Sequence, residues 1–404
     1  MKKQFTVTAV SLICIGSASA QSLFDLAPSS EDSEPLPLTW TGGASLGFDD
    51  NIAPFLPGSD QSSLYGSAYV GASFLSRTPA ATTEFFARLG VVHYFEDIES
   101  GGLSADQSSE VAGLGLNWTN RISDRLRIVS RNNLAKQREP DYSQGFQGSV
   151  SGDYLRWSTD QAVGYRWSER LGTYTGVRYE DVSYDDIDGF DRSSVTLYND
   201  FRYQLSPQTV ATFTYRFTEV DGGLDSDSTN SYFLAGLEHR FSPNTLGVIK
   251  AGVQSRDVDG GGEGSSPYVE ASLRSQINEQ FAIRSYVRYG VEDYARRVVL
   301  GGIGAVPFEG SETLRLGLTG TYGLSEQLSL NAGVNYVSMG YVDSFVAYPD
   351  VDEDSLNLSV GFRLELSDTM WLNGSYNFET LSSDIGNIRE YDRNRINLGV
   401  NTTF

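Results

Sequence analysis

The sequence predicts an all-β chain, a transmembrane antiparallel up-and-down β-barrel of about 18 strands, with 16 strands as the main alternative. Three observations support this fold class. From Leu38 onward, stretches of about ten residues alternate between apolar and polar side chains. Short connections alternate with longer ones rich in Asp, Gly and Ser, and the short connections resemble one another closely. After the first residues, no apolar run reaches the roughly 18 residues that a membrane-spanning helix requires.

The first twenty residues have the pattern of a cleavable secretory signal. Lys2 and Lys3 precede an apolar run, and Ser17 to Ala20 are the small residues expected before a cleavage site. We therefore predict a signal peptide at 1–20, a flexible and acidic periplasmic lead-in at 21–37, and the barrel at 38–404.

Composition excludes several classes of protein. Acidic residues number 52 against 30 basic ones, for a net charge of −22, which disfavours nucleic-acid binding. The only cysteine, Cys14, falls in the predicted signal, so disulfides and cysteine metal sites are not expected. The sequence predicts no metal site and no cofactor. The abundant Gly, Tyr and Phe suit strands, turns and aromatic girdles.

The short turns are near-copies of one motif, in which Ser or Asn follows an apolar residue and can bond its own backbone two residues on. The motif recurs at 122–126, 167–171, 205–209, 241–245, 277–281, 324–328 and 366–370. Between the connections, we predict strands at 38–48, 63–76, 82–95, 110–121, 125–135, 153–167, 171–184, 193–205, 209–220, 231–241, 245–256, 266–277, 280–294, 311–323, 327–338, 355–366, 369–380 and 391–404.

Alternation in the last strand assigns its faces. Ile396, Leu398, Val400 and Phe404 share the lipid-facing side. A terminal Phe404 in this register resembles the assembly signal of outer-membrane proteins, which implies the barrel-assembly machinery as a partner.

The turn motifs, the stretch Gly317 to Leu324 and the closing Tyr391 to Val400 resemble the β-barrel porin type 2 family of Gram-negative bacteria. The resemblance covers nearly the whole predicted mature chain. It implies an outer-membrane location, contact with outer-membrane lipid and lipopolysaccharide, and transport without a named solute. Some members are linked with exopolysaccharide or capsule export. The resemblance implies no catalytic residue.

The alternation also predicts a charged ladder on the inner wall. Two interpretations are open: the charges pair to hold the barrel rigid, or part of the ladder faces water and steers anions or sugars. Tyr174, Tyr198 and Tyr286 are expected to face the same way. The ladder consists of Arg88, Arg127, Arg166, Arg178, Arg202, Arg216, Arg274, Arg284, Arg288, Arg315, Arg363, Arg395, Asp200, Glu238, Glu270, Glu292, Glu365 and Glu379.

One long connection is unusually apolar. We predict that it folds over or into the mouth and narrows it, and an outward β-extension or a partner contact is the alternative. The residues of this possible constriction are Val298, Val299, Leu300, Ile303, Val306 and Phe308.

Catalysis has little support, and we predict no enzyme. His93 and His239 both have lipid-facing parity, and no Ser–His pair is expected at the same rim and face.

The leading hypothesis is a porin-like passive channel for small polar or anionic solutes, including sugars, because about 18 strands leave an aqueous lumen. The alternatives are an outer-membrane component of exopolysaccharide or capsule export, and a structural or adhesive surface barrel. The oligomeric state is unknown from the sequence.

Overall fold

The computed structural model describes residues 36–52, 61–100, 103–105, 107–137, 153–185, 191–222, 227–293, 297–300, 304–344, 351–384 and 390–404. The predicted signal peptide and nearly all of the predicted lead-in lie outside these residues. Among the described residues, no helix is long and apolar enough to cross a membrane.

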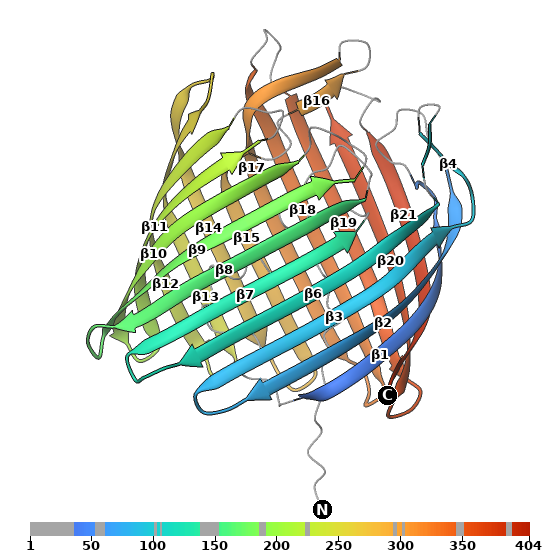
Figure 1. Cartoon of the computed structure of the whole chain (residues 1–404), viewed down its shortest axis with the longest axis horizontal. Coiled ribbons are helices and arrows are strands. Elements are labelled where there is room, and N and C mark those ends of the chain that lie inside the picture. The colour runs from blue at the N-terminus through green and yellow to red at the C-terminus, as the bar shows by residue number, and fades with distance from the viewer. Residues whose placement is uncertain are drawn as a thin grey trace, which may run out of the picture.

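Eighteen antiparallel strands close into an up-and-down barrel, as predicted (Figure 1). Consecutive strands pair, and β1 pairs with β21 to close the cylinder. The barrel strands are β1 (Leu36–Asp49), β2 (Ser63–Arg77), β3 (Ala81–Tyr94), β6 (Ser108–Arg121), β7 (Leu126–Gln137), β8 (Tyr154–Arg166), β9 (Leu171–Tyr184), β10 (Arg192–Ser206), β11 (Thr209–Asp221), β12 (Ser228–Ser242), β13 (Thr245–Val258), β14 (Glu263–Gln276), β15 (Phe281–Glu292), β17 (Gly304–Gly323), β18 (Leu328–Ser344), β19 (Val351–Glu365), β20 (Met370–Ser383) and β21 (Tyr391–Thr403).

The barrel has two distinct ends. At the end where β1 begins and β21 finishes, successive strands are joined by tight turns, and we call this the short-turn end (Figure 1). At the other end the connections are longer in most cases, and we call it the long-loop end. The turn that joins β13 to β14 at the long-loop end contains Gly260, whose φ of 74° lies in the left-handed region.

The short turns use the predicted side-chain bonds. The hydroxyl or amide oxygen accepts a hydrogen bond from the backbone N–H two residues on, at Ser123, Ser168, Ser206, Ser242, Asn278, Ser325 and Ser367. The turn between β2 and β3 was not recognised as a copy, yet Thr78 Oγ1 accepts from the N–H of Ala81 at 2.9 Å. A hydroxyl at the first turn position therefore has the same role whether Ser or Thr supplies it.

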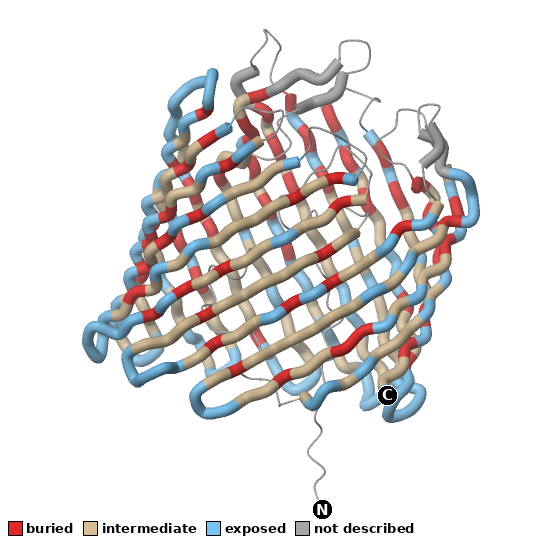
Figure 2. Tube along the Cα trace, viewed as in Figure 1, coloured by how far each residue is buried: buried red, intermediate tan, exposed pale blue. Residues whose placement is uncertain are grey.

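The outer wall is apolar over most of its height. Large side chains such as Leu46, Leu89 and Phe241 are 67%, 64% and 65% exposed there. Polar and charged side chains of the opposite parity are buried or half-buried. Figure 2 shows the buried residues spread along the strands of the whole barrel. An exposed apolar band that covers most of the outer wall needs lipid to cover it, which makes the barrel a membrane-spanning one.

The strands extend further at the long-loop end than the sequence indicated. β17 begins at Gly304 rather than 311, and β18 ends at Ser344 rather than 338. The short strand β16 (Arg297–Leu300) folds back on the start of β17, with Val298 opposite Val306. A second small hairpin joins β4 (Ile98–Ser100) to β5 (Leu103–Ala105). Because valine favours extended backbone, the apolar connection forms a β-hairpin at the rim.

Candidate functional site

The inner wall carries all the residues of the predicted ladder. Each lies at the parity opposite to the exposed apolar side chains of its own strand. Their surroundings differ, because some are buried in networks of charge and others are exposed towards the short-turn end. The structure adds further inward charged residues that sequence reasoning missed, namely Asp49, Arg131, Arg156, Asp160, Glu180, Lys250, Arg256, Glu353 and Arg393.

Asp160, in the middle of β8, is the centre of the first network. Its carboxylate lies 3.0 Å from Nη2 of Arg178 and 3.5 Å from Nη1 of Arg131. The hydroxyl of Tyr198 donates to the same carboxylate at 2.7 Å. Asp160 is only 5% exposed, so these three donors replace the water that a buried carboxylate needs.

Tyr198 reaches Asp160 because a glycine lies between them. Tyr198 is on β10 and Asp160 on β8, and Gly176 of β9 is the direct neighbour of Tyr198. A Cβ at Gly176 would lie 2.5 Å from the tyrosine hydroxyl oxygen, which no packing tolerates. The tyrosine ring therefore covers the glycine, and its hydroxyl contacts the strand beyond.

Asp200 of β10 is the centre of a second network. Nζ of Lys250 lies 3.3 Å from one carboxylate oxygen, and Nη1 of Arg202 lies 3.4 Å from the other. Arg202 also donates to Glu238 at 2.6 Å. Lys250 is 3% exposed and is held by the buried Asp200 carboxylate and by the Thr214 hydroxyl, to which its Nζ donates at 2.9 Å. Its inward parity was the signal available in the sequence.

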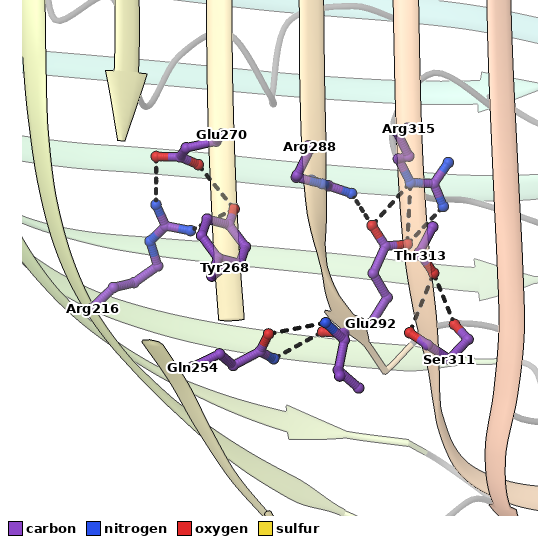
Figure 3. A network of polar contacts seen from close by, with 10 residues as sticks. Arg216, Gln254, Tyr268, Glu270, Arg288, Glu292, Ser311, Thr313 and Arg315 are labelled. Atoms are coloured by element: carbon purple, nitrogen blue, oxygen red, sulfur yellow. Dashed lines mark hydrogen bonds and ion pairs between the residues drawn. The ribbon is translucent and has the colours of Figure 1, made fainter. Parts of the chain in front are cut away.

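Two more networks lie side by side in Figure 3. Arg216 of β11 lies 3.4 Å from Glu270 of β14, and Tyr268 donates to Glu270 at 2.9 Å. On the next strands, Glu292 is held between Arg288 and Arg315, and Nη2 of Arg315 donates to it at 2.6 Å. Arg315 and Glu270 are 1% and 2% exposed, so both networks are shielded from water.

Asp49 joins the first and last strands. Arg393 of β21 donates to its carboxylate through Nε at 3.0 Å and also through Nη2, the two-point geometry that arginine offers. Nε of Arg395 lies 3.2 Å from the same carboxylate. Asp49 is 0% exposed, and the pair therefore fastens the seam at which the barrel closes.

Three of these ion pairs skip strands, namely Arg202 with Glu238, Arg216 with Glu270 and Lys250 with Asp200. Arg216 and Glu270 are separated by two intervening strands, and so are Lys250 and Asp200. Strands in a barrel are tilted, so residues at one height are offset along neighbouring strands. Directly opposed pairs occur as well, since Arg131 and Arg178 lie opposite Asp160 and Arg395 lies opposite Asp49.

The short-turn end is more open. Arg166 and Arg284 are exposed on the inner face, and Glu365 is exposed beside Arg363. Slightly deeper, the Arg88 guanidinium lies 3.7 Å above the Tyr69 ring, and that of Arg363 lies 4.3 Å from the Trp371 ring. These arginines stack on aromatic faces, an arrangement that leaves the edge of the guanidinium available to other acceptors.

The long-loop end contains an apolar cluster on the inner side. Phe308 is 0% exposed and packs with Val337, Met339, Tyr341 and Val351. Of the predicted constriction residues, Phe308 thus joins a buried cluster, and Ile303 lies outside the described residues. Val298, Val299, Leu300 and Val306 belong to the hairpin of β16 and β17. Narrowing of the mouth by this hairpin stays a prediction.

The predicted tyrosines differ in their contacts. Tyr198 belongs to the Asp160 network, and Tyr286 donates to Asn335 at 3.2 Å. Tyr174 lies over Gly164 and packs near Tyr198. All three are on the inner side, where they fill the wall between the charged groups.

The prediction that no serine meets a histidine is wrong. His93 Nδ1 lies 2.8 Å from Ser108 Oγ on the outer face. His239 makes a matching contact with Thr209 at 2.9 Å, near the other rim. Both are direct neighbours on paired strands, which the sequence could not place without the register.

The two histidines have the same surroundings. Each packs edge-on against the phenylalanine two residues later, Phe95 or Phe241. In the described part of the chain, the hydrogen-bond partner of each ring is a hydroxyl and not a carboxylate. The repeated arrangement fits two rim hydrogen bonds better than a catalytic pair. No group of side chains suited to a metal ion is present in the described part of the chain.

Searches against known proteins give fold-level neighbours only. No protein-family model matches the chain, and no curated protein matches it in sequence. Solved structures that are similar include OccAB4 from Acinetobacter baumannii, at 15% identity and TM-score 0.47, covering 92% of this chain and 99% of that one.

OpdK from Pseudomonas aeruginosa, solved with vanillate, covers 91% of this chain and 99% of its own at 12% identity, with a TM-score of 0.48. OccK2 (OpdF) from Pseudomonas aeruginosa, solved with glucuronate, has 12% identity, 91% and 98% coverage, and a TM-score of 0.47. At these levels the likeness carries no argument about what this chain transports. The resemblance to the β-barrel porin type 2 family is not confirmed by any match.

Proposed function

We propose that this chain is a passive outer-membrane channel for small polar solutes, with a preference for anions. The observation that carries the proposal is the sign of the inner wall. Among the described residues, inward basic side chains outnumber inward acidic ones, although the whole chain has a net charge of −22. The basic residues are therefore concentrated where a solute would pass.

The chemistry of this wall supports small carboxylates and sugars as solutes. An exposed arginine such as Arg166 offers paired donors to a carboxylate. A low-dielectric wall around them focuses the positive potential and raises the local anion concentration. The buried arginines are paired with carboxylates of the inner wall, so they would fix the shape of the lumen and would not select the solute.

The location and assembly of the barrel are part of the proposal. The exposed apolar band would face outer-membrane lipid and lipopolysaccharide. Phe404 is 72% exposed on the outer face, where its backbone pairs with Trp40. This register supports a role for Phe404 in recognition by the barrel-assembly machinery. The resemblance to the β-barrel porin type 2 family implies transport in the same membrane.

The test is solute entry into liposomes that contain the purified, refolded full-length chain. We expect swelling in isotonic solutions of small monocarboxylates and monosaccharides, with faster swelling for the carboxylate at equal size. No swelling with any solute, in vesicles shown to contain heat-modifiable folded barrel, would contradict the proposal.

One observation favours a second candidate, export of a surface polysaccharide. Tyr94, Tyr154 and Tyr341 are 2%, 2% and 0% exposed on the inner side near the long-loop end. A lumen that is filled by side chains at this level would open for a polymer only when a partner protein binds the barrel. A deletion strain that loses surface polysaccharide, with unchanged uptake of small solutes, would favour export over passive diffusion.

A further inference from the structure

The outer face of four adjacent strands breaks the apolar pattern. In β7 to β10, outward positions carry uncharged polar side chains instead of the aliphatic and aromatic ones found elsewhere. We call these residues the polar patch: Ser130 and Asn132 on β7, Thr159 and Gln161 on β8, Thr175 on β9 and Asn199 on β10.

Aromatic side chains mark the depth of the polar patch. On β8, Trp157 lies towards the long-loop end and packs on Tyr179 at a centroid distance of 5.2 Å. Tyr165 lies towards the short-turn end and packs on Trp167 at 4.7 Å. Thr159 and Gln161 fall between these two aromatic pairs. Since aromatic girdles lie at the membrane interfaces, the polar patch is at the level of the hydrocarbon core.

The members of the polar patch hydrogen-bond to one another. Nε2 of Gln161 donates to Thr159 at 2.8 Å and to Asn132 at 3.2 Å. Thr159 donates to Asn132 at 2.7 Å, and Asn132 donates to Ser130 at 3.0 Å. These contacts lower the cost of polar groups in hydrocarbon without removing it, because amides and hydroxyls have further hydrogen-bonding capacity.

Asn199 is a member of the polar patch whose amide is not fully hydrogen-bonded. Its Nδ2 donates to Thr175 at 2.5 Å, whereas its Oδ1 is shielded from solvent and has no hydrogen-bond partner among the described residues. A lipid tail cannot supply a donor at this depth. The Asn199 amide is therefore incompletely satisfied by the described residues, at a depth where lipid offers no partner.

The rest of the described outer wall lacks such a group. On β12 the corresponding residues are Phe233, Ala235 and Leu237, and on β19 they are Leu356, Leu358 and Val360. Ser285 on β15 is an isolated polar residue at mid-height. The polar patch is therefore a local property of one face, and not a general tolerance of this barrel for polar outward residues.

We propose that the polar patch is the contact between two copies of this chain, related by a two-fold axis along the membrane normal. Asn and Gln amides both donate and accept, so a surface of amides and hydroxyls is complementary to itself, as a two-fold contact requires. The polar patch has no charge, so two copies of a chain with net charge −22 meet there without a charged pair in hydrocarbon.

Cysteine cross-linking tests the contact directly. The only native cysteine, Cys14, precedes the described barrel, so Gln161→Cys places one thiol in the polar patch. The matched control is Ser285→Cys, which faces outward at similar height on another face. With a short thiol-specific cross-linker in native membranes, we expect a covalent dimer for Gln161→Cys and none for Ser285→Cys. Equal cross-linking of the two variants would overturn the proposal.

A second experiment measures the assembly in the wild-type chain. We expect native mass spectrometry from nanodiscs to give the mass of two copies. Asn132→Leu with Gln161→Leu should shift the mass to one copy, while Ser285→Leu keeps two. A wild-type mass of one or three copies would contradict a two-fold contact. Heat modifiability shows whether the double variant is folded. If the double variant is not folded, the cross-linking of Gln161→Cys against Ser285→Cys decides the proposal.

Discussion

The inner wall holds its arginines in two ways, depending on height. From mid-barrel to the long-loop end, arginines such as Arg315 and Arg393 are almost fully buried and clamp buried carboxylates. At the short-turn end, Arg166 and Arg284 are exposed. The same residue type at the same inward parity therefore has a structural role in one region and faces the lumen in the other.

This difference has a physical origin. Desolvating a guanidinium is costly unless a carboxylate and further donors or acceptors complete its surroundings. The networks centred on Asp160, Asp200, Glu292 and Asp49 supply the buried cations with a carboxylate, and Glu270 supplies one to Arg216. An exposed arginine such as Arg166 keeps part of its water and can exchange that water for a passing anion.

The largest effect is expected from breaking a buried clamp. Arg315→Met leaves Glu292 buried with only Arg288, and should lower the free energy of unfolding by about 3 kcal/mol. Urea titration of the folded barrel in lipid vesicles, followed by tryptophan fluorescence, measures it. Arg284→Met is the control from the exposed group and should cost less than about 1 kcal/mol. Equal losses for the two would remove the distinction between the regions.

The next largest effect on the free energy of unfolding is expected from substituting the glycine beneath Tyr198. Gly176→Ala would push the ring away from Asp160, and should lower the free energy of unfolding by about 2 kcal/mol. Gly172, on the same strand and face, is the matched control. A Cβ there meets only the Tyr165 carbonyl oxygen at 3.4 Å, so Gly172→Ala should be neutral. If Gly176→Ala were as stable as Gly172→Ala, the ring would not depend on the glycine.

The tyrosine hydroxyl itself accounts for part of that effect. Tyr198→Phe removes the donor to Asp160 and should cost about 1.5 kcal/mol, as expected for a hydrogen bond to a charged group. Tyr174→Phe, on the inner face of the neighbouring strand, is the matched control and should cost much less. The same urea titration compares them, and a larger loss for Tyr174→Phe would contradict the assignment.

The smallest effect is expected at the turns. Ser325→Ala removes the side-chain bonds to the N–H groups of Gln327 and Leu328, and should cost about 0.5 kcal/mol because water can replace them. Glu326→Ala in the same turn is the control and should be neutral. A loss as large as that of Arg315→Met would mean that this turn, rather than the clamps, limits stability.

The strands and turns could be predicted because their signals are local. Alternation and the Ser or Asn turn motif are readable within five to ten residues, and the structure confirms every predicted barrel strand to within a few residues except at the outer ends of β17 and β18. The extension of β17 could not be predicted because the apolar connection near Val298 lacks the alternation of apolar and polar residues that marks the other strands. The turn at Thr78 could not be recognised from the motif, because it has Thr where the other short turns have Ser or Asn.

The partners within the ladder could not be predicted in the same way. Strand alternation gives the side on which Lys250 lies, but the tilt of the strands decides that it meets Asp200 three strands away. The polar patch was overlooked for a related reason. Asn132 and Gln161 are outward by parity, yet only the register shows that they are neighbours.

The central claim is that exposed arginines at the short-turn end make an open lumen selective for anions. The most direct measurement is the reversal potential of single channels across a tenfold KCl gradient, for the wild type and for Arg166→Gln with Arg284→Gln. We predict an ohmic, anion-selective wild-type channel, and a double variant that conducts with its selectivity shifted towards cations. A cation-selective wild type, or a double variant with unchanged reversal potential, would contradict the account.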